Sequence, residues 1–211
     1  KRFFIGLDQK LLNKTEVVYP SINKIKKFPQ KNKWITFVGK LNSSKGYDIY
    51  KDAILKILDE FKDWTALSIG DESRDRPHIR HIRHKEIGFK THKEVLKILS
   101  KTQIAVVPSR WEEPFGRTAL ESGSRGCATI ISNRGGLPET VPHSLKLEKL
   151  DSFNLYKKIK YLIANHKFRR KIQTNSFKDV IHTVKENSNL IDNIRESIFF
   201  KINLNIKKNN L

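Results

Sequence analysis

The sequence predicts an α/β domain built on a parallel β-sheet with helices on both faces. From Trp34 onward, short apolar segments alternate with amphipathic ones, which is the order expected when each strand is followed by a covering helix. The apolar segments are rich in Val and Ile and lack regular polar alternation, as expected of strands buried on both sides. With 211 residues, 37% of them hydrophobic, the chain is long enough to form such a core.

The elements follow in a regular order. Residues 1–33 are predicted to be a lead-in from a preceding domain or linker, with a candidate edge strand in VVYPS. Strands are then predicted at 34–39, 65–70, 85–89, 103–109 and 127–132, and helices at 47–61, 92–100 and 116–126. Pro138 suits the first turn of a further helix. The carboxyl-terminal part is predicted to be helical over 151–166, 167–186 and 188–200, with Asp151 as a cap.

The composition limits the classes of function. No run approaches the roughly 18 to 20 apolar residues of a membrane span, and the first residues lack a signal peptide, so a cytoplasmic protein is expected. The 42 Lys and Arg against 22 Asp and Glu give a formal charge of +20, which attracts phosphates, acidic lipid surfaces or nucleic acid. No zinc-finger spacing or RNA-recognition signature is present, so specific nucleic-acid binding is not expected.

Two further features have a structural interpretation. Cys127, the single cysteine, lies in a predicted strand, which places it in the core rather than at a reactive site. His78, His81 and His84 recur at a spacing of three, but helical geometry would spread them around the axis and four arginines lie nearby. A basic crossover loop is therefore expected there, and no metal.

The chain starts with Lys1 and contains no methionine, so we expect it to be part of a longer protein.

The segment PSRWEEPFGRTALES, residues 108–122, carries two acids at the end of a predicted strand. Glu113 precedes Pro114, where we expect a helix to begin, which leaves the amides around Phe115, Gly116 and Arg117 free to bind phosphate. Glu121 would lie about two turns into this helix. Ionised carboxylates accept hydrogen bonds and suit a vicinal diol, so the ligand should combine phosphate with hydroxyl groups.

Two other segments are expected at the same edge, because ligands of such sheets bind beyond the carboxyl ends of the strands. Lys40 and Lys45, in KLNSSKGYD, bracket a turn that can hold a diphosphate. Gly135 and Gly136, in NRGGLPET, permit close approach of a backbone. An ordinary surface turn remains the alternative for both segments.

Three ordered motifs resemble the retaining nucleotide-sugar glycosyltransferases of the GT-B fold (family 4-like, glycosyl transferases group 1). FVGKLNSSKGYD resembles the G-R-L-x-x-x-K-G segment of that family, and VVPSRWEEPFGRTALES resembles its P-S-x-x-E-P-F-G-x-x-x-L-E-A stretch with the E-x7-E motif. GCATIISNRGGLPETV resembles G-x-P-V-I-x-x-x-x-G-G-x-P-E-x-V. The resemblance runs from about Val17 to Val141 and implies the Rossmann-like, carboxyl-terminal half of a GT-B fold.

The resemblance also implies roles for individual residues. Lys40 and Lys45 would bind the donor diphosphate, Glu121 the nucleotide ribose, and Glu113, the candidate catalytic residue, the hydroxyls of the transferred sugar. The amides after Phe115 would assist. Lys40 replaces the usual Arg, IGDES keeps only the first glycine of G-D-G, and ESGSRG replaces E-A-M-A-x-G, so the identity of the donor stays open. No cofactor or metal is implied, and there is no D-x-D motif.

Residues 34–165 would accordingly form the nucleotide-sugar-binding domain, and residues 166–211 would be helices packing on it and toward a missing N-terminal acceptor domain. The expected activity is transfer of a sugar from a UDP- or GDP-sugar, with retention of configuration, to a cell-envelope polysaccharide or lipid-linked acceptor. Without the N-terminal domain the chain should be inactive. A peripheral contact with the inner face of the membrane stays open. The alternatives are a basic nucleic-acid- or membrane-surface-binding module and a glycoside hydrolase using Glu113 and Glu121.

Overall fold

A computed structural model of the chain describes residues 15–74, 77–181 and 183–209. It comprises two compact units. The larger unit, residues 24–181, contains the sheet, and the smaller one is formed by residues from 1–23 and 182–211. The units are described separately below.

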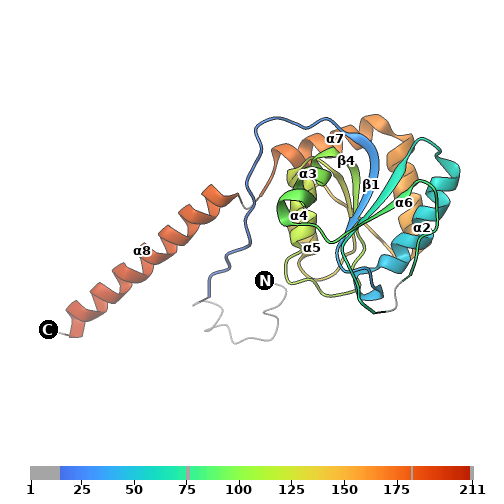
Figure 1. Ribbon diagram of the computed structural model, residues 1–211. Coiled ribbons are helices and arrows are strands. Elements are labelled where there is room, and N and C mark those ends of the chain that lie inside the picture. The colour runs from blue at the N-terminus through green and yellow to red at the C-terminus, as the bar shows by residue number, and fades with distance from the viewer. Residues whose placement is uncertain (1–14, 75–76, 182, 210–211) are drawn as a thin grey trace. The chain divides into compact units, whose positions relative to one another are not determined.

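Six parallel strands form one sheet in the order β3-β2-β1-β4-β5-β6 (Figure 1). The strands are β1 (Asn32–Val38), β2 (Thr65–Ile69), β3 (His84–Gly88), β4 (Thr102–Val107), β5 (Ala128–Ile131) and β6 (Leu145–Lys146). β1 pairs with both β2 and β4, so the strand order reverses between β1 and β4. Such a reversal is the topological switch point at which ligands of open parallel sheets bind. The predicted α/β fold with a Rossmann-like parallel sheet is confirmed.

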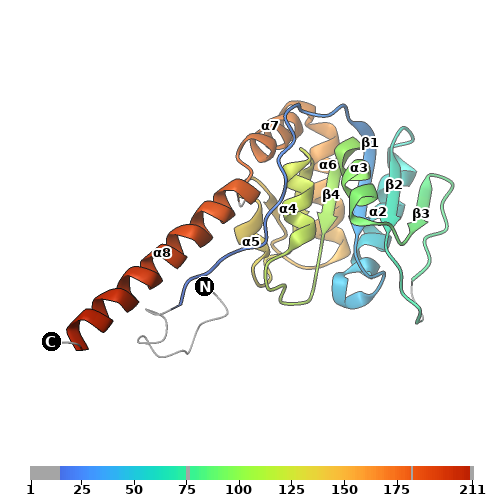
Figure 2. The same cartoon turned by 60° about the vertical axis from the view of Figure 1, so that its left-hand side comes forward.

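Helices cover both faces of this sheet (Figures 1 and 2). α2 (Tyr47–Glu60) and α6 (Ser152–Ala164) pack together on one face, and α3 (His92–Lys101) and α4 (Arg117–Ser124) pack together on the other. α7 (His166–Lys178) contacts α4 and β5, and the short α5 (Leu137–Thr140) follows β5. As expected, Asp151 caps α6 by accepting from the Asn154 amide (2.7 Å), and Pro138 lies in the first turn of α5.

The alternation of side chains along each strand divides the core in two. Ile35, Phe37, Ile104 and Val106 face α2 and α6, whereas Ala105 faces α3 together with the residues of its cluster, Ile69, Val95, Leu99 and Cys127. Cys127 is fully buried, and its thiol donates to the carbonyl of Leu99 (3.2 Å), which confirms that it belongs to the core. Burial raises the pKa of this thiol.

The carboxyl-terminal helices differ from the prediction. The single helix expected over 167–186 is interrupted: α7 ends at Lys178, and α8 (Val184–Asn209) starts after Thr183. Thr183 and Glu186 form a reciprocal pair, in which the Thr183 amide donates to Glu186 Oε2 (2.9 Å) and the Glu186 amide to Thr183 Oγ1 (3.3 Å). This is the T-x-x-E capping box, a start signal that lies inside the segment TVKE.

Two strand predictions also need correction. The candidate edge strand at 17–21 is irregular, and only a bridge between Ile22 and Thr183 follows it, consistent with Pro20, which cannot donate to a ladder. β6 was not predicted, because its two residues, Leu145 and Lys146, carry no apolar run.

Residues 24–33 and 166–181 also belong to the larger unit. Two contacts show how these segments pack on the sheet unit. Phe28 contacts the ring of Phe177 with a centroid distance of 5.2 Å, and Gln173 Nε2 donates to the carbonyl of Gln103 in β4 (2.9 Å).

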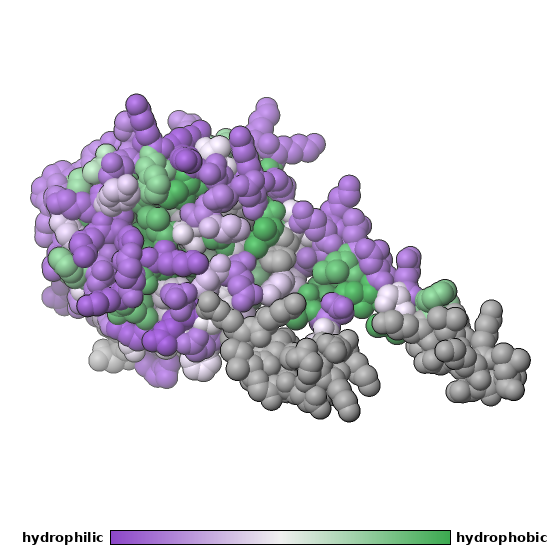
Figure 3. Space-filling model, turned by 180° about the vertical axis from the view of Figure 1, so that it is seen from behind, coloured by the Kyte–Doolittle hydropathy of each residue, from purple (hydrophilic) through white to green (hydrophobic). Residues whose placement is uncertain are grey.

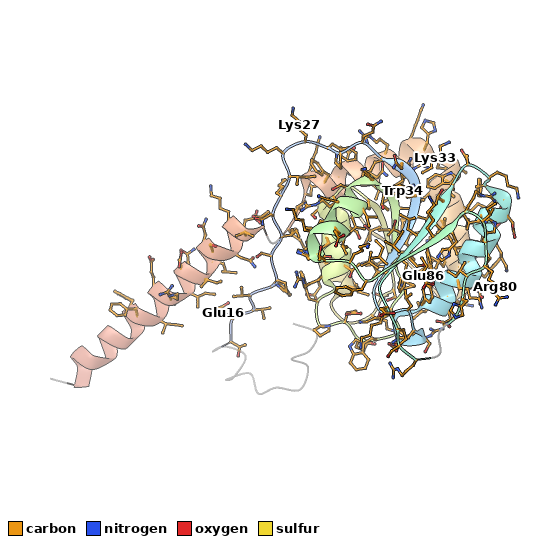
Figure 4. The ribbon with its side chains drawn as sticks, viewed as in Figure 1. Glu16, Lys27, Lys33, Trp34, Arg80 and Glu86 are labelled. Atoms are coloured by element: carbon orange, nitrogen blue, oxygen red, sulfur yellow. The ribbon has the colours of Figure 1, made fainter. Side chains whose placement is uncertain are left out.

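The surface of the larger unit is mostly hydrophilic on the face seen in Figure 3. Its basic residues are spread widely, and Lys27, Lys33 and Arg80 are all exposed (Figure 4). Exposed basic residues thus occur on separate elements of this unit, so a high positive charge does not by itself mark a site.

Candidate functional site

A pocket of about 320 Å³ lies beyond the carboxyl ends of β1 and β4. We call it the switch-point pocket; it is lined by the end of β1 (Phe37, Val38, Gly39), by Lys45, and by the end of β4 and the segment after it (Val107, Ser109, Glu113, Pro114, Phe115, Gly116, Arg117, Thr118). Two of the three motifs identified in the sequence thus meet where the strand order reverses.

The turn after β1 is locked against the end of β4. The side-chain oxygen of Asn42 accepts from the Lys45 amide (3.2 Å) and the Ser44 hydroxyl (2.8 Å), which closes the 3-10 turn η2 (Ser43–Lys45). Gly46 follows with φ of +72°, and a Cβ there would lie 2.0 Å from the carbonyl oxygen of Pro108. Only glycine satisfies both conditions, so this contact fixes the base of the Lys45 side chain beside the pocket.

Glu113 and Lys45 face each other in the pocket. Lys45 Nζ lies 2.5 Å from Glu113 Oε1, and the Ser109 hydroxyl donates to the same oxygen (3.0 Å). The side chains of Lys45 and Glu113 are 30% and 17% exposed, and both residues line the pocket. With a cation and a carboxylate held this close, the cation can bind the phosphate of a ligand while the carboxylate accepts hydrogen bonds from hydroxyls of the same ligand.

The helix after the loop begins later than expected. α4 starts at Arg117, three residues after Pro114, and its cap is Gly116 with φ of +100°. The left-handed geometry of Gly116 breaks the chain between Pro114 and the helix, and a Cβ at Gly116 would lie 2.5 Å from Leu137 Cδ2. The Ala119 amide donates to the Gly116 carbonyl (3.0 Å), which leaves the amides of Arg117 and Thr118 as the ones without an acceptor in the helix, and both residues line the pocket. The helix start at which we expected phosphate to bind thus lies about one turn later than predicted.

Glu121 lies outside the lining of this pocket and only about one turn into α4, not two. Its side chain is 9% exposed, with Oε1 at 3.0 Å from His92 Nε2 and 3.6 Å from Arg117 Nε. Burial raises the pKa of Glu121, while His92, Arg117 and Arg125 act in the opposite direction.

Sequence reasoning missed His92, the first residue of α3. In a parallel sheet, polar groups that follow the strands gather at the edge formed by their carboxyl ends. This rule was applied to the other strands, and applying it to β3 would have identified His92.

The glycine pair has a packing role. A Cβ at Gly135 would lie 2.3 Å from the carbonyl oxygen of Glu113, and one at Gly136 would lie 2.6 Å from that of Pro114. The Gly136 amide donates to the Glu113 carbonyl (2.7 Å). The close approach is therefore between these glycines and the loop that carries Glu113, and neither glycine lines the pocket.

Glu112 strengthens the same junction and was not predicted. Its Oε2 accepts from the Gly135 amide (2.6 Å), and its Oε1 accepts from Arg134 Nη1 (3.0 Å). Lys40, in contrast, is exposed, lies outside the pocket lining and makes no hydrogen bond or ion pair within the described part of the chain.

The three regularly spaced histidines do not converge. His81 Nε2 lies 3.4 Å from Asp59, His84 in β3 shares a hydrogen bond with the Ser68 hydroxyl (2.8 Å), and His78 is exposed. Among residues 15–74, 77–181 and 183–209, no cluster of His, Cys, Asp and Glu has an arrangement suited to a metal ion. In the same described residues, no helix has the length and apolar character needed to span a bilayer.

Known proteins that resemble this chain include glycosyltransferases. Spore coat protein SA of Bacillus subtilis is 28% identical over 122 residues, which are 52% of this chain and 32% of that protein. The uncharacterized glycosyltransferase MJ1607 of Methanocaldococcus jannaschii is 31% identical over 119 residues, which are 54% of this chain and 30% of that protein. The matched segment thus spans about a third of each of these relatives.

Solved structures show the same fold. The C-terminal domain of the glycosyl transferase group 1 family protein LpcC from Francisella tularensis has a TM-score of 0.61 at 23% identity, covering 74% of this chain and 89% of that one. Anabaena Alr3699/HepE in complex with UDP-glucose has a TM-score of 0.68 at 20% identity, covering 79% of this chain and 49% of that one. The sequence model of the glycosyl transferases group 1 family matches residues 19–179, more than half of the 211 residues, and the chain therefore belongs to that family.

Proposed function

We propose that this chain is the carboxyl-terminal, donor-binding domain of a retaining, family 4-like GT-B glycosyltransferase. It would bind a nucleotide diphosphate sugar and, together with an amino-terminal domain, transfer the sugar to a cell-envelope polysaccharide or a lipid-linked acceptor. Family membership supports the class of reaction. The complexes of Alr3699/HepE with UDP and with UDP-glucose favour UDP as the first donor nucleotide to test.

The single observation that carries the proposal is the convergence of three groups on the switch-point pocket. Lys45 supplies a cation, the first turn of α4 supplies amides at the positive end of a helix dipole, and Glu113 supplies a carboxylate. A diphosphate bonded to a sugar is a ligand that uses all three. A free phosphate would give Glu113 no sugar hydroxyl in addition to the Ser109 hydroxyl that it already binds.

In this proposal Lys45 and the α4 amides bind the diphosphate, and Lys40 approaches it from the exposed side. When the diphosphate pairs with the Lys45 ammonium group, Glu113 loses this ion-pair partner. Its carboxylate can then accept hydrogen bonds from hydroxyls of the transferred sugar. Glu121, held by His92 and Arg117, accepts from the ribose hydroxyls. Gly135 and Gly136 act indirectly, by fixing the loop that carries Glu113.

Catalysis would then consist of positioning the donor and stabilising the negative charge on the leaving diphosphate. No covalent nucleophile is assigned. A glycoside hydrolase using Glu113 and Glu121 is disfavoured, because only Glu113 lines the pocket, whereas a hydrolase needs both carboxyl groups to flank one bond.

The test is calorimetry of the chain with UDP, GDP and ADP at physiological ionic strength. We expect saturable binding of at least one of them, and a loss of about 1 to 3 kcal/mol in Lys45→Ala, the scale of a charge-assisted contact. Lys56→Ala, at an exposed position of α2 outside the pocket lining, serves as the control of equal charge. Absence of binding by all three nucleotides at millimolar concentration would remove the donor-domain assignment.

A further inference from the structure

A second pocket, of about 530 Å³, lies at the opposite edge of the sheet. We call it the amino-end pocket; it is lined in part by Phe28, Lys31, His166, Arg169, Arg170 and Gln173. Lys31 directly precedes β1, and Gln103, another lining residue, is the second residue of β4. Because the strands are parallel, their starts lie at the edge away from their carboxyl ends, so this pocket is distinct from the switch-point pocket.

The ionisable side chains lining this pocket are all basic. They are Lys31, His166, Arg169 and Arg170. Within the described part of the chain, none of the four forms an ion pair with a carboxylate. Burial lowers the pKa of Lys31; Cys127 acts in the opposite direction, and the charges of Arg170 and Arg125 lower the pKa further.

The cations are held in place by neutral partners. The Arg170 guanidinium lies over the ring of Phe28, 4.0 Å from its centroid, and Lys31 Nζ lies 5.7 Å from the same centroid. Lys31 also donates to the carbonyl oxygens of Arg125 (2.5 Å) and Leu99 (3.2 Å), which are at the carboxyl-terminal ends of α4 and α3. Arg169 Nη1 likewise donates to the carbonyl oxygens of Leu162 and Ile163 (3.0 Å for the latter), near the end of α6. These helix ends offset part of the positive charge of Lys31 and Arg169, and no carboxylate contributes.

The start of α7 adds to this positive potential. His166 is the first residue of α7, and the preceding residue, Asn165, makes no side-chain cap to the first turn. The amides of that turn have no acceptor within the helix and carry the positive end of its dipole. Cations and helix amides together are the groups that bind phosphate in proteins.

We propose that the amino-end pocket binds a phosphomonoester dianion. Two guanidinium groups, one ammonium group and a helix amino terminus around a single opening suit a doubly charged tetrahedral group better than a single carboxylate. The phosphomonoester can belong to a soluble ester or to the headgroup of an anionic lipid, and both present the same chemistry to the pocket. This inference does not depend on the function proposed for the switch-point pocket.

The experiment is a titration of the whole chain with glycerol phosphate, at fixed ionic strength and by calorimetry, and in parallel with phosphatidylcholine vesicles with and without phosphatidic acid. Arg170→Ala should weaken binding about tenfold or more. Lys171→Ala, an equal loss of charge at the next, exposed position of α7, should leave binding unchanged. Arg170→Gln, which keeps a long side chain over Phe28, provides a second variant if Arg170→Ala does not fold by circular dichroism.

Each outcome decides the proposal. Arg170-dependent binding of glycerol phosphate supports a soluble ester, and Arg170-dependent binding only to vesicles that contain phosphatidic acid supports a lipid headgroup. Equal weakening in Lys171→Ala and Arg170→Ala would show attraction to the overall positive charge and overturn the proposal. A loss of binding that occurs only in Lys45→Ala would place the phosphate in the switch-point pocket and would also overturn the proposal. The absence of saturable binding to either probe would overturn it as well.

Discussion

Glu113 and Glu121 are eight positions apart in one motif but lie in different surroundings. Glu113 lies in the switch-point pocket, paired with Lys45, whereas Glu121 is almost buried beside His92 and Arg117. A carboxylate in an open pocket can change its orientation to accept hydrogen bonds from different sugars. A carboxylate held by two basic side chains presents its acceptor oxygens in a fixed geometry. This difference supports separate roles for the two acids in donor binding.

The separation of roles leads to a paired prediction. Glu121→Ala should weaken binding of the nucleoside diphosphate itself, and Glu113→Ala should weaken only the additional affinity for the sugar nucleotide. Each loss should be about 1.5 to 3 kcal/mol, or roughly ten- to hundredfold in affinity. Calorimetry of both variants with UDP and UDP-glucose checks this, with Glu148→Ala, an exposed acid paired with Lys158, as the control. Equal losses for both ligands in both variants would contradict the division.

The surroundings of Glu121 also predict a pH dependence. Because burial raises its pKa above the ordinary value of 4.5, the carboxylate needed for ribose hydroxyls becomes protonated as the pH falls through that raised pKa. As the pH is lowered, UDP affinity should therefore begin to fall while the pH is still above 4.5. His92 opposes the effect of burial, so in His92→Ala the midpoint should move to higher pH. Affinity measured from pH 5 to 8 tests this, and His143→Ala, whose histidine pairs with Asp179, should leave the midpoint in place.

The same shift separates binding from folding. A carboxyl group whose folded pKa is raised contributes stability below its unfolded pKa, and this contribution is lost as the pH rises through the folded pKa. At neutral pH, ionised Glu121 thus does not favour the folded state through its own titration. A loss of UDP affinity on lowering the pH through the raised pKa of Glu121 should therefore occur without a loss of stability from the titration of this group.

At the scale of elements, the pocket depends on two junctions made by glycines. Gly46 places the turn after β1 against Pro108, and Gly135 with Gly136 places the loop after β5 against the segment 113–114. In each case the backbone of one loop fills the space that a Cβ would need. The loops are thus positioned by direct backbone contact, which keeps Lys45 and Glu113 within reach of each other.

This contact can be measured with two glycines of nearly equal φ. Gly46 and Gly88 have φ of +72° and +73°, but a Cβ at Gly88 would meet no atom within 4 Å. Gly88→Ala should cost only the backbone strain, about 1 to 2 kcal/mol, whereas Gly46→Ala adds the clash with Pro108 and should cost about 2 to 5 kcal/mol. Urea unfolding gives both values. Equal costs would mean that the Pro108 contact relaxes freely and does not position the turn.

Much of the element order follows from the sequence because buried parallel strands and amphipathic helices have distinct periodicities. The strands around Phe37, Val106 and Ile130 were predicted in this way, and so was the capping role of Asp151. The start of α4 was placed too early, since the preference of proline for a first turn was weighed above the left-handed geometry of Gly116. The pairing of Glu121 with His92 is a contact over 29 residues, and no local pattern specifies it.

At the scale of the whole molecule, the formal charge of +20 complicates any binding experiment. Attraction of a polyanion to a positive surface falls steeply with salt, whereas contacts inside a pocket are screened less. Matched variants that remove one positive charge from the surface and one from the pocket are therefore the appropriate comparison for both pockets of the larger unit.

The last prediction concerns turnover. The alignment with Alr3699/HepE covers 79% of this chain but only 49% of that protein. The matched segments are about a third of the two curated relatives, so we expect the acceptor site to belong to another domain. The purified 211 residues should bind UDP. They should not cleave UDP-glucose to UDP in the presence of an acceptor, because no acceptor hydroxyl would be aligned with the donor. A coupled assay for UDP release, run beside the complete polypeptide and after calorimetry has shown that the isolated chain binds UDP, makes the comparison. Transfer by the 211 residues alone would mean that this single sheet and its helices contain the acceptor site as well.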